Sequence, residues 1–174
     1  MDNNEIDIFV FAEKGDVAAE GARLFVEKAA EAIAERGRFG VVLAGGSTPA
    51  AMYQLLQQEA WQRQVDWERV HVFWGDERFV APDHTLNSWR EATELFLGQV
   101  PIPAENVWPM PTVGLGVGEA AEVYESRLRS FFGQEEPRFD LIFLGMGADG
   151  HTASLFPGRA GVLEEDAWVV GVEG

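Results

Sequence analysis

The chain has no cysteine and few basic residues. Its 174 residues include 13 lysines and arginines against 29 aspartates and glutamates, which gives a formal net charge of −16. The absence of cysteine excludes disulfides, thiolate nucleophiles and thiolate metal sites. The shortage of basic residues argues against nucleic acid or an anionic membrane as a partner, because both require a positively charged face. If the ligand is an anion, a few basic side chains must create a local positive site.

Long apolar runs and clustered histidines are also missing. No stretch approaches the ~20 apolar residues of a membrane-spanning helix, and the acidic start, residues 1–5, lacks the basic residues of a signal peptide. The 3 histidines are scattered without the i, i+4 pairing of a metal site. We therefore expect a cytoplasmic protein that uses no metal and no cofactor. Its length and composition suit one globular domain, residues 1–174.

Apolar segments of strand length alternate with helical patterns along the chain. The expected strands are 6–11, 39–44, 70–74 and 139–144, with weaker candidates at 107–110 and 168–172. The expected helices are 16–36, a helix that starts at Pro49, 88–97 and 119–132. This alternation predicts right-handed βαβ units, and hence an α/β fold with a mostly parallel sheet and helices on both faces.

The segment 139–158 carries the strongest functional signal. An apolar strand runs into a glycine-rich turn, residues 145–150, which places Asp149 two residues before His151. Glycine permits positive φ and a close approach of the backbone to a ligand. Small molecules bind beyond the carboxyl ends of parallel strands, where an imidazole can move protons and a carboxylate can fix its tautomer. The sequence therefore predicts a catalytic loop.

The same turn also matches the dinucleotide fingerprint G-x-G-x-x-G, with Glu173 at about the expected distance. That fingerprint requires a helix that opens directly from the glycines. Here Pro157, Gly158 and Gly161 interrupt the chain before the next candidate strand, so no crossover helix of normal length fits. Nucleotide binding is the weaker interpretation of this turn.

Two further loops follow expected strands and carry groups suited to an anion. The first, residues 45–49, reads Gly-Gly-Ser-Thr-Pro and leads into a helix that Thr48 could cap, with Pro49 at its first position. Its backbone N–H groups and the helix dipole favour a phosphate or carboxylate, although a tight, well-capped connection would use the same residues. The lysine of a P-loop is absent, which argues against a nucleoside triphosphate.

The second loop carries Asp76-Glu77-Arg78 after the strand 70–74. In a functional interpretation, a carboxylate holds substrate hydroxyls while Arg78 binds a phosphate as a bidentate partner. A solvated loop with an internal ion pair is the alternative.

Taken together, three motifs resemble 6-phosphogluconolactonases of the glucosamine-6-phosphate isomerase/6-phosphogluconolactonase family. They are Leu43-Ala-Gly-Gly-Ser-Thr-Pro49, Trp74-Gly-Asp-Glu-Arg-Phe-Val80 with Asp83, His84 and Asn87, and Gly145-Met-Gly-Ala-Asp-Gly-His-Thr-Ala-Ser-Leu-Phe-Pro157. The resemblance implies hydrolysis of 6-phosphoglucono-δ-lactone to 6-phosphogluconate in the oxidative pentose phosphate pathway. It also implies a fold similar to that of ribose-5-phosphate isomerase and glucosamine-6-phosphate deaminase.

The resemblance further implies roles for individual residues. His151 would be the acid/base residue with Asp149 beside it. The implied substrate and phosphate contacts are Gly45, Gly46, Ser47, Thr48, Asp76, Arg78, Asn87, Gly147 and Gly150. Many relatives carry Ser-Asn where this chain has Asn87-Ser88, which leaves the role of Asn87 open. Relatives also continue beyond the position of Gly174, including a basic residue that helps to bind phosphate, so we expect this chain to lack the family's C-terminal portion.

Two rival functions remain on the same scaffold. One rival is a sugar-phosphate isomerase or deaminase. The loop of the deaminase family resembles this one but carries a glutamate five residues after its histidine, where this chain has Phe156. A non-catalytic sugar-phosphate sensor would keep the phosphate loop but would not need both Asp149 and His151, and it would normally be joined to a DNA-binding segment. The expected partner is a small phosphosugar lactone, and the sequence leaves the oligomeric state undetermined.

Overall fold

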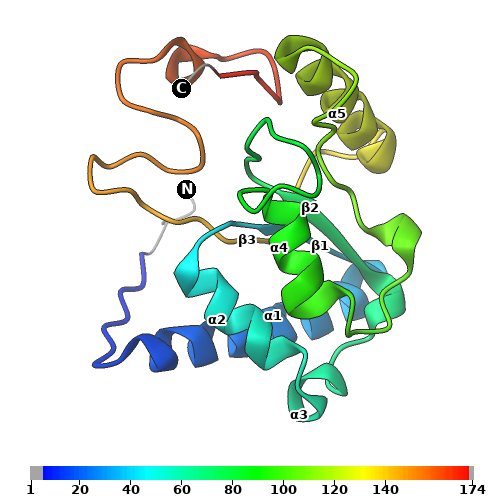
Figure 1. Ribbon diagram of the computed structural model, residues 1–174. Helices are drawn as coiled ribbons and strands as arrows, with labels where there is room; N and C mark the ends of the chain where they lie inside the picture. Colours follow the sequence, from blue (N-terminus) through cyan, green and yellow to red (C-terminus); the bar gives the residue numbers. More distant parts are fainter. Residues whose placement is uncertain (1–5, 173–174) are drawn as a thin grey trace.

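The sheet consists of three parallel strands in the order β2-β1-β3 (Figure 1). The computed structural model describes residues 6–172, so the acidic start and Glu173 lie outside the described residues. The strands are β1 (Phe39–Leu43), β2 (Val70–Trp74) and β3 (Leu141–Ile142). Leu43 pairs with Trp74, so β1 and β2 end at the same level. The predicted α/β class with a parallel sheet is confirmed.

Helices cover both faces of this sheet, as the sequence predicts (Figure 1). One face carries α1 (Lys14–Arg36), α2 (Ser47–Leu56) and α4 (Ser88–Ala92), which continues as the π-helical turn η2 (Thr93–Leu97). The other face carries α5 (Val117–Phe132). The short elements are α3 (Glu59–Gln62), η1 (Trp67–Arg69), η3 (Ala104–Asn106) and η4 (Ala160–Leu163). None of the helices within residues 6–172 has the length and apolarity that crossing a membrane requires.

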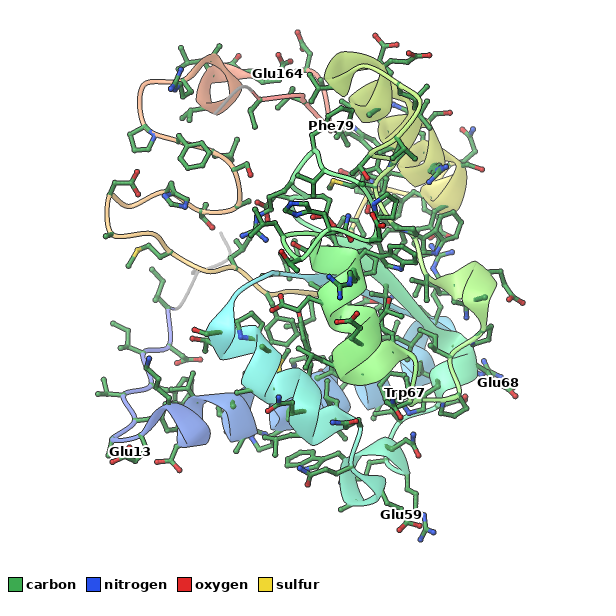
Figure 2. The ribbon with its side chains drawn as sticks, in the orientation of Figure 1. Glu13, Glu59, Trp67, Glu68, Phe79 and Glu164 are labelled. Carbon is green, nitrogen blue, oxygen red and sulfur yellow. The ribbon has the colours of Figure 1, made fainter. Side chains whose placement is uncertain are left out.

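The alternation of side chains along β1 explains why both faces need cover. Val41 and Leu43 belong to the larger core cluster with α1 and α2, whereas Val42 packs on the other face with Tyr124 of α5. All residues of β1 are buried. A strand that is paired on both edges and covered on both faces must be apolar throughout. In the same core, Trp67 (labelled in Figure 2) is 3% exposed. The centroid of its ring lies 5.7 Å from that of Phe25.

Two predicted helix starts are corrected. The first helix begins at Lys14 with Glu13 as N-cap, two residues before the predicted start at residue 16, and it ends as predicted at Arg36, followed by Gly37 with a φ of 75°. The second helix begins at Ser47 with Gly46 as its N-cap and no side-chain cap, so Thr48 is not the cap and Pro49 is not the first residue. Gly46 has a φ of 114°, which glycine adopts more readily than other residues. The helix therefore starts at a glycine and without a hydroxyl cap.

Four strand predictions are wrong or too long. Residues 6–11 form no regular secondary structure and are exposed, with no strand partner among the described residues. Residues 168–172 form no strand and run beside α5, where the backbone N–H groups of Trp168 and Val169 donate to Glu125. The segment 107–110 contributes a single bridge to β2, and 139–144 pairs only at β3, which is not buried. In each case the apolar pattern is present, but a strand also needs a neighbour to pair with.

Buried tyrosines hold the carboxyl ends of β1 and β2. The Tyr53 hydroxyl on α2 donates to the Ala44 carbonyl at 2.7 Å, directly after β1. The backbone N–H of Trp74, at the end of β2, donates to the Tyr124 hydroxyl on α5 at 3.3 Å. Burial raises the pKa of both tyrosines, so both hydroxyls stay neutral at physiological pH. Each face of the sheet therefore supplies one polar group that fixes a strand end.

We expect Tyr53→Phe to lower the free energy of unfolding by about 1–2 kcal/mol, because a partly buried carbonyl loses its donor while the ring contacts remain. Urea denaturation followed by tryptophan fluorescence measures this difference. Phe96, which stacks on Tyr53 with ring centroids 4.8 Å apart, should keep the phenyl ring in place. Equal stability of the two proteins would contradict a structural role for this hydrogen bond.

Candidate functional site

A cavity of about 200 Å³ lies where the loops that follow β1, β2 and β3 meet. Its lining includes Gly45 after β1, Asp76 and Arg78 after β2, and Gly147 and His151 after β3. The central strand β1 has its sequence neighbour β2 on one side and β3 on the other. Ligands of open parallel sheets bind at such a switch in strand order, beyond the carboxyl ends. The structure thus brings together predicted residues from all three loops.

The imidazole of His151 and the carboxylate of Asp149 form a close pair. His151 Nδ1 lies 2.5 Å from Asp149 Oδ1. The hydrogen bond with His151 holds the pKa of Asp149 below its usual value, so this carboxylate is ionised at neutral pH. An ionised carboxylate only accepts hydrogen bonds, so Nδ1 of His151 carries the proton. In the neutral ring Nε2 is then free to accept a proton, as a general base requires.

The glycines of the 145–150 turn allow this pairing. Gly150 has a φ of 86°. Gly147 donates its N–H to the His151 carbonyl at 2.8 Å, and a Cβ at Gly147 would overlap the His151 ring. No helix opens from the turn, since the next helical residues are Ala160–Leu163 of η4. This turn therefore lacks the helix of a dinucleotide site and forms a support for the imidazole.

Arg78 lies beside the glycine loop that follows β1. Its Nη1 donates to Ser88 Oγ at 3.0 Å, and a Cβ at Gly45 would lie 3.0 Å from the same nitrogen. Among residues 6–172 no carboxylate forms an ion pair with Arg78, whereas Arg90 pairs with Glu94. The guanidinium is therefore available to an anion.

The start of α2 adds backbone donors next to this guanidinium. The first N–H groups of a helix have no acceptor within the helix, and they attract anions together with the helix dipole. Ser47 and Thr48 occupy these positions in α2, while Pro49 has no N–H to offer. The loop that follows β1 therefore presents its N–H groups beside a positive charge.

Glu77, for which the sequence predicts no individual role, holds the loop after β2 in place. One of its carboxylate oxygens accepts from the backbone N–H groups of Arg78 at 2.9 Å and Ser88 at 2.8 Å. The other oxygen accepts from Trp89 N at 2.9 Å. The proposed ion pair within the loop is therefore not formed. Ser88 and Trp89 lie 11 and 12 residues further along the chain, so no local sequence pattern indicates this role.

Asn87 supports α4 and does not line the cavity. It is 2% exposed, and its Oδ1 accepts from Arg90 N at 2.8 Å as the N-cap of α4. Asp149 and Gly150 also lie outside the cavity lining. Asp149 contacts His151, which does line the cavity. Within residues 6–172 no three His, Asp or Glu side chains gather to form a metal site.

Several exposed glutamates lie far from this cavity. Glu13, Glu59, Glu68 and Glu164 lie at the outer margin of the molecule (Figure 2) and are exposed. Many of the basic residues pair with such carboxylates on the surface, for example Arg23 with Glu20. Arg78 thus provides a local positive charge on a strongly acidic chain.

Replacement of Gly147 by Ala should displace the His151 ring from Asp149, because a Cβ at this position overlaps the ring. The His151 Hε1–Cε1 signal in an NMR spectrum should shift or broaden. Gly145→Ala is the matched control, since its Cβ would meet nothing within 4 Å, and it should leave this signal unchanged. Identical His151 signals in both variants would contradict the described packing.

Comparison with known proteins identifies the family. A family model described as glucosamine-6-phosphate isomerases/6-phosphogluconolactonase matches residues 12–174. The 6-phosphogluconolactonase of Synechocystis sp. is 48% identical over 130 residues, which cover 73% of this chain and 52% of the relative. That of Nostoc sp. is 40% identical over 151 residues, which cover 85% and 61%.

Solved structures agree with these sequence relatives. The 6-phosphogluconolactonase from Trypanosoma brucei has a TM-score of 0.81 at 32% identity, covering 92% of this chain and 67% of that one. The enzyme from Thermotoga maritima has a TM-score of 0.70 at 35% identity, covering 80% and 60%. The chain spans about half to two thirds of the length of these relatives. With a family match from residue 12 to residue 174 and a shared fold, this chain belongs to the glucosamine-6-phosphate isomerase/6-phosphogluconolactonase family.

Proposed function

We propose that this chain carries the hydrolytic site of a 6-phosphogluconolactonase, which converts 6-phosphoglucono-δ-lactone and water into 6-phosphogluconate. The observation that supports this most directly is the His151–Asp149 pair, with His151 lining the same cavity as Arg78. One side of the cavity offers a base and another offers a positive charge, and the start of α2 follows directly after Gly45 of the lining. A phosphorylated lactone needs both.

In the proposed mechanism His151 Nε2 takes a proton from water as the water oxygen attacks C1 of the lactone. The C1–O bond to the ring oxygen then breaks, and the imidazolium returns its proton to that oxygen. Asp149 accepts the Nδ1–H bond throughout and stabilises the imidazolium. Positioned acid/base catalysis of this kind contributes about 10²–10⁴-fold to the rate. The step consumes one water and requires no other reactant.

The phosphate end of the substrate is proposed to lie at Arg78 and the start of α2. Phosphate favours guanidinium through two parallel hydrogen bonds, and it favours helix N–H groups through the helix dipole. Asp76 lines the cavity between the two ends and could accept hydrogen bonds from sugar hydroxyls. Gly45, Gly46, Ser47 and Thr48 remain proposed phosphate contacts, and Gly147 and Gly150 support the His151 loop.

The two rival functions fit the site less well. The position at which the deaminase carries a ring-opening glutamate is Phe156, whose ring centroid lies 4.6 Å from that of His151. A phenyl ring cannot transfer a proton between carbon and oxygen atoms. A non-catalytic sensor would have no need for an imidazole whose tautomer is fixed by a carboxylate. The lactonase hypothesis gives a role to Asp76, Arg78 and His151, the charged and imidazole side chains of the cavity lining.

His151→Asn should lower kcat for fresh 6-phosphoglucono-δ-lactone by about 10²–10⁴-fold relative to the unmodified chain, because the general base is lost. Hydrolysis is followed by acid release above the spontaneous background. His84→Asn is the matched control. His84 is exposed, its Nδ1 accepts from Leu86 N, and asparagine can keep such a turn bond. Near-normal turnover of His151→Asn would overturn the assignment.

Arg78→Lys should raise KM by about 10- to 100-fold, since lysine keeps the charge but loses the planar pair of donors. Binding of the product, 6-phosphogluconate, measured by calorimetry should weaken to a similar extent. Arg90→Lys is the control, because Arg90 already pairs with Glu94. An unchanged affinity in Arg78→Lys would place the phosphate elsewhere.

A further inference from the structure

Among residues 6–172, one hydrogen bond joins the loop that carries His151, residues 145–155, to another part of the protein. Ser154 Oγ donates to Asp76 Oδ2 at 2.7 Å. The other hydrogen bonds of residues 145–155 close within the loop, including Thr152 Oγ1 to the Gly145 carbonyl at 2.9 Å. Within residues 6–172, no second hydrogen bond links this stretch to another element. Its position relative to the sheet therefore depends on this contact.

The backbone next to Ser154 is held in an uncommon conformation. Ala153 has a φ of 50°, and it is the one described residue other than glycine with positive φ. An alanine rarely adopts this conformation, because its Cβ crowds the backbone. Such strain persists only where surrounding contacts determine it. Here Thr152 is bonded on one side and Ser154 on the other, so Ala153 turns the chain and directs Ser154 toward Asp76.

The backbone at Asp76 is held in place because this residue comes directly after the β1–β2 ladder. The N–H of Gly75 donates to the Leu43 carbonyl at 3.1 Å, which extends the ladder between β1 and β2 by one residue. Asp76, Ala153 and His151 all line the cavity. A bond from Ser154 to Asp76 therefore ties the imidazole to the edge from which Arg78 also extends.

We propose that Ser154 is a positioning residue, whose hydrogen bond to Asp76 sets the place of His151 relative to Arg78 and the loop after β1. The proposal rests on the proposed lactonase function for its kinetic part only. Ser154 does not line the cavity, so it acts through the loop and not on the substrate. Loss of its hydroxyl should impair the chemical step and leave phosphate binding intact.

The kinetic test uses Ser154→Ala with fresh 6-phosphoglucono-δ-lactone. We expect kcat to fall by about 10- to 100-fold, as a displacement of a catalytic group by about 1 Å can cause, while KM stays within about twofold. Ser130→Ala is the matched control, because Ser130 is exposed on α5 and should change neither constant. In a double variant with Asp76→Ala, the Ser154 substitution should cause no further loss of kcat. A full additional loss would overturn the proposal.

A second measurement does not depend on turnover. The His71, His84 and His151 Hε1 signals are recorded by NMR and assigned with His151→Asn. In Ser154→Ala the His151 signal should shift or broaden while the other two stay in place. If the unmodified chain hydrolyses no lactone, the proposed function fails, yet this spectrum still tests the positioning role. An unchanged His151 signal with unchanged kcat would refute it.

Folding of the variants is checked by thermal unfolding. Should Ser154→Ala fail to fold, Ser154→Cys carries the same expectations, since a thiol keeps the shape of the side chain but is a weak donor. Retention of the His151 signal in a folded Ser154→Cys protein would likewise count against the hydrogen bond as the positioning contact.

Discussion

The pairing of β1 with a strand on each side is the constraint from which the site follows. The backbone of β1 pairs with β2, for example at Leu43–Trp74, and with β3, for example at Val42–Ile142. Paired strands lie about 4.8 Å apart, so three loops that leave neighbouring strands at one edge must begin close together. The base, the guanidinium and the helix start therefore come within reach of one small molecule.

The groups around the cavity divide into those that hold the backbone and those left free for a ligand. Glu77, Asn87 and the tyrosine hydroxyls are occupied by backbone partners. Arg78 and His151 are only partly occupied. An anionic substrate meets repulsion from a chain of net charge −16, but this field is screened beyond about 8 Å in physiological salt. Recognition must therefore act at short range, through donors in direct contact.

Sequence patterns predict a strand reliably where burial on both faces requires a continuous run of apolar residues. The strand 70–74 was predicted with its observed bounds, because nearly all its residues are apolar and buried. The meeting of the three loops was also predictable, since parallel strands share one carboxyl edge. The patterns failed at 6–11 and 168–172, where apolar residues indicate what could be buried but not whether a partner strand lies nearby. The roles of Glu77, Ser88 and Ser154 depend on contacts between distant segments, which no local pattern records. The substrate contacts, the cytoplasmic location and the single domain stay predictions.

The position of β3 at the end of the sheet has a consequence for the behaviour of the protein in solution. Among the described residues nothing pairs with its outer edge, and Ile142 and Leu144 beside it are 49% and 60% exposed. Open edges with apolar side chains promote pairing between copies of a chain. A net charge of −16 keeps copies apart, and that protection disappears near the isoelectric point of about 4.4. The excess of carboxylates thus opposes association of copies through the exposed side chains of Ile142 and Leu144.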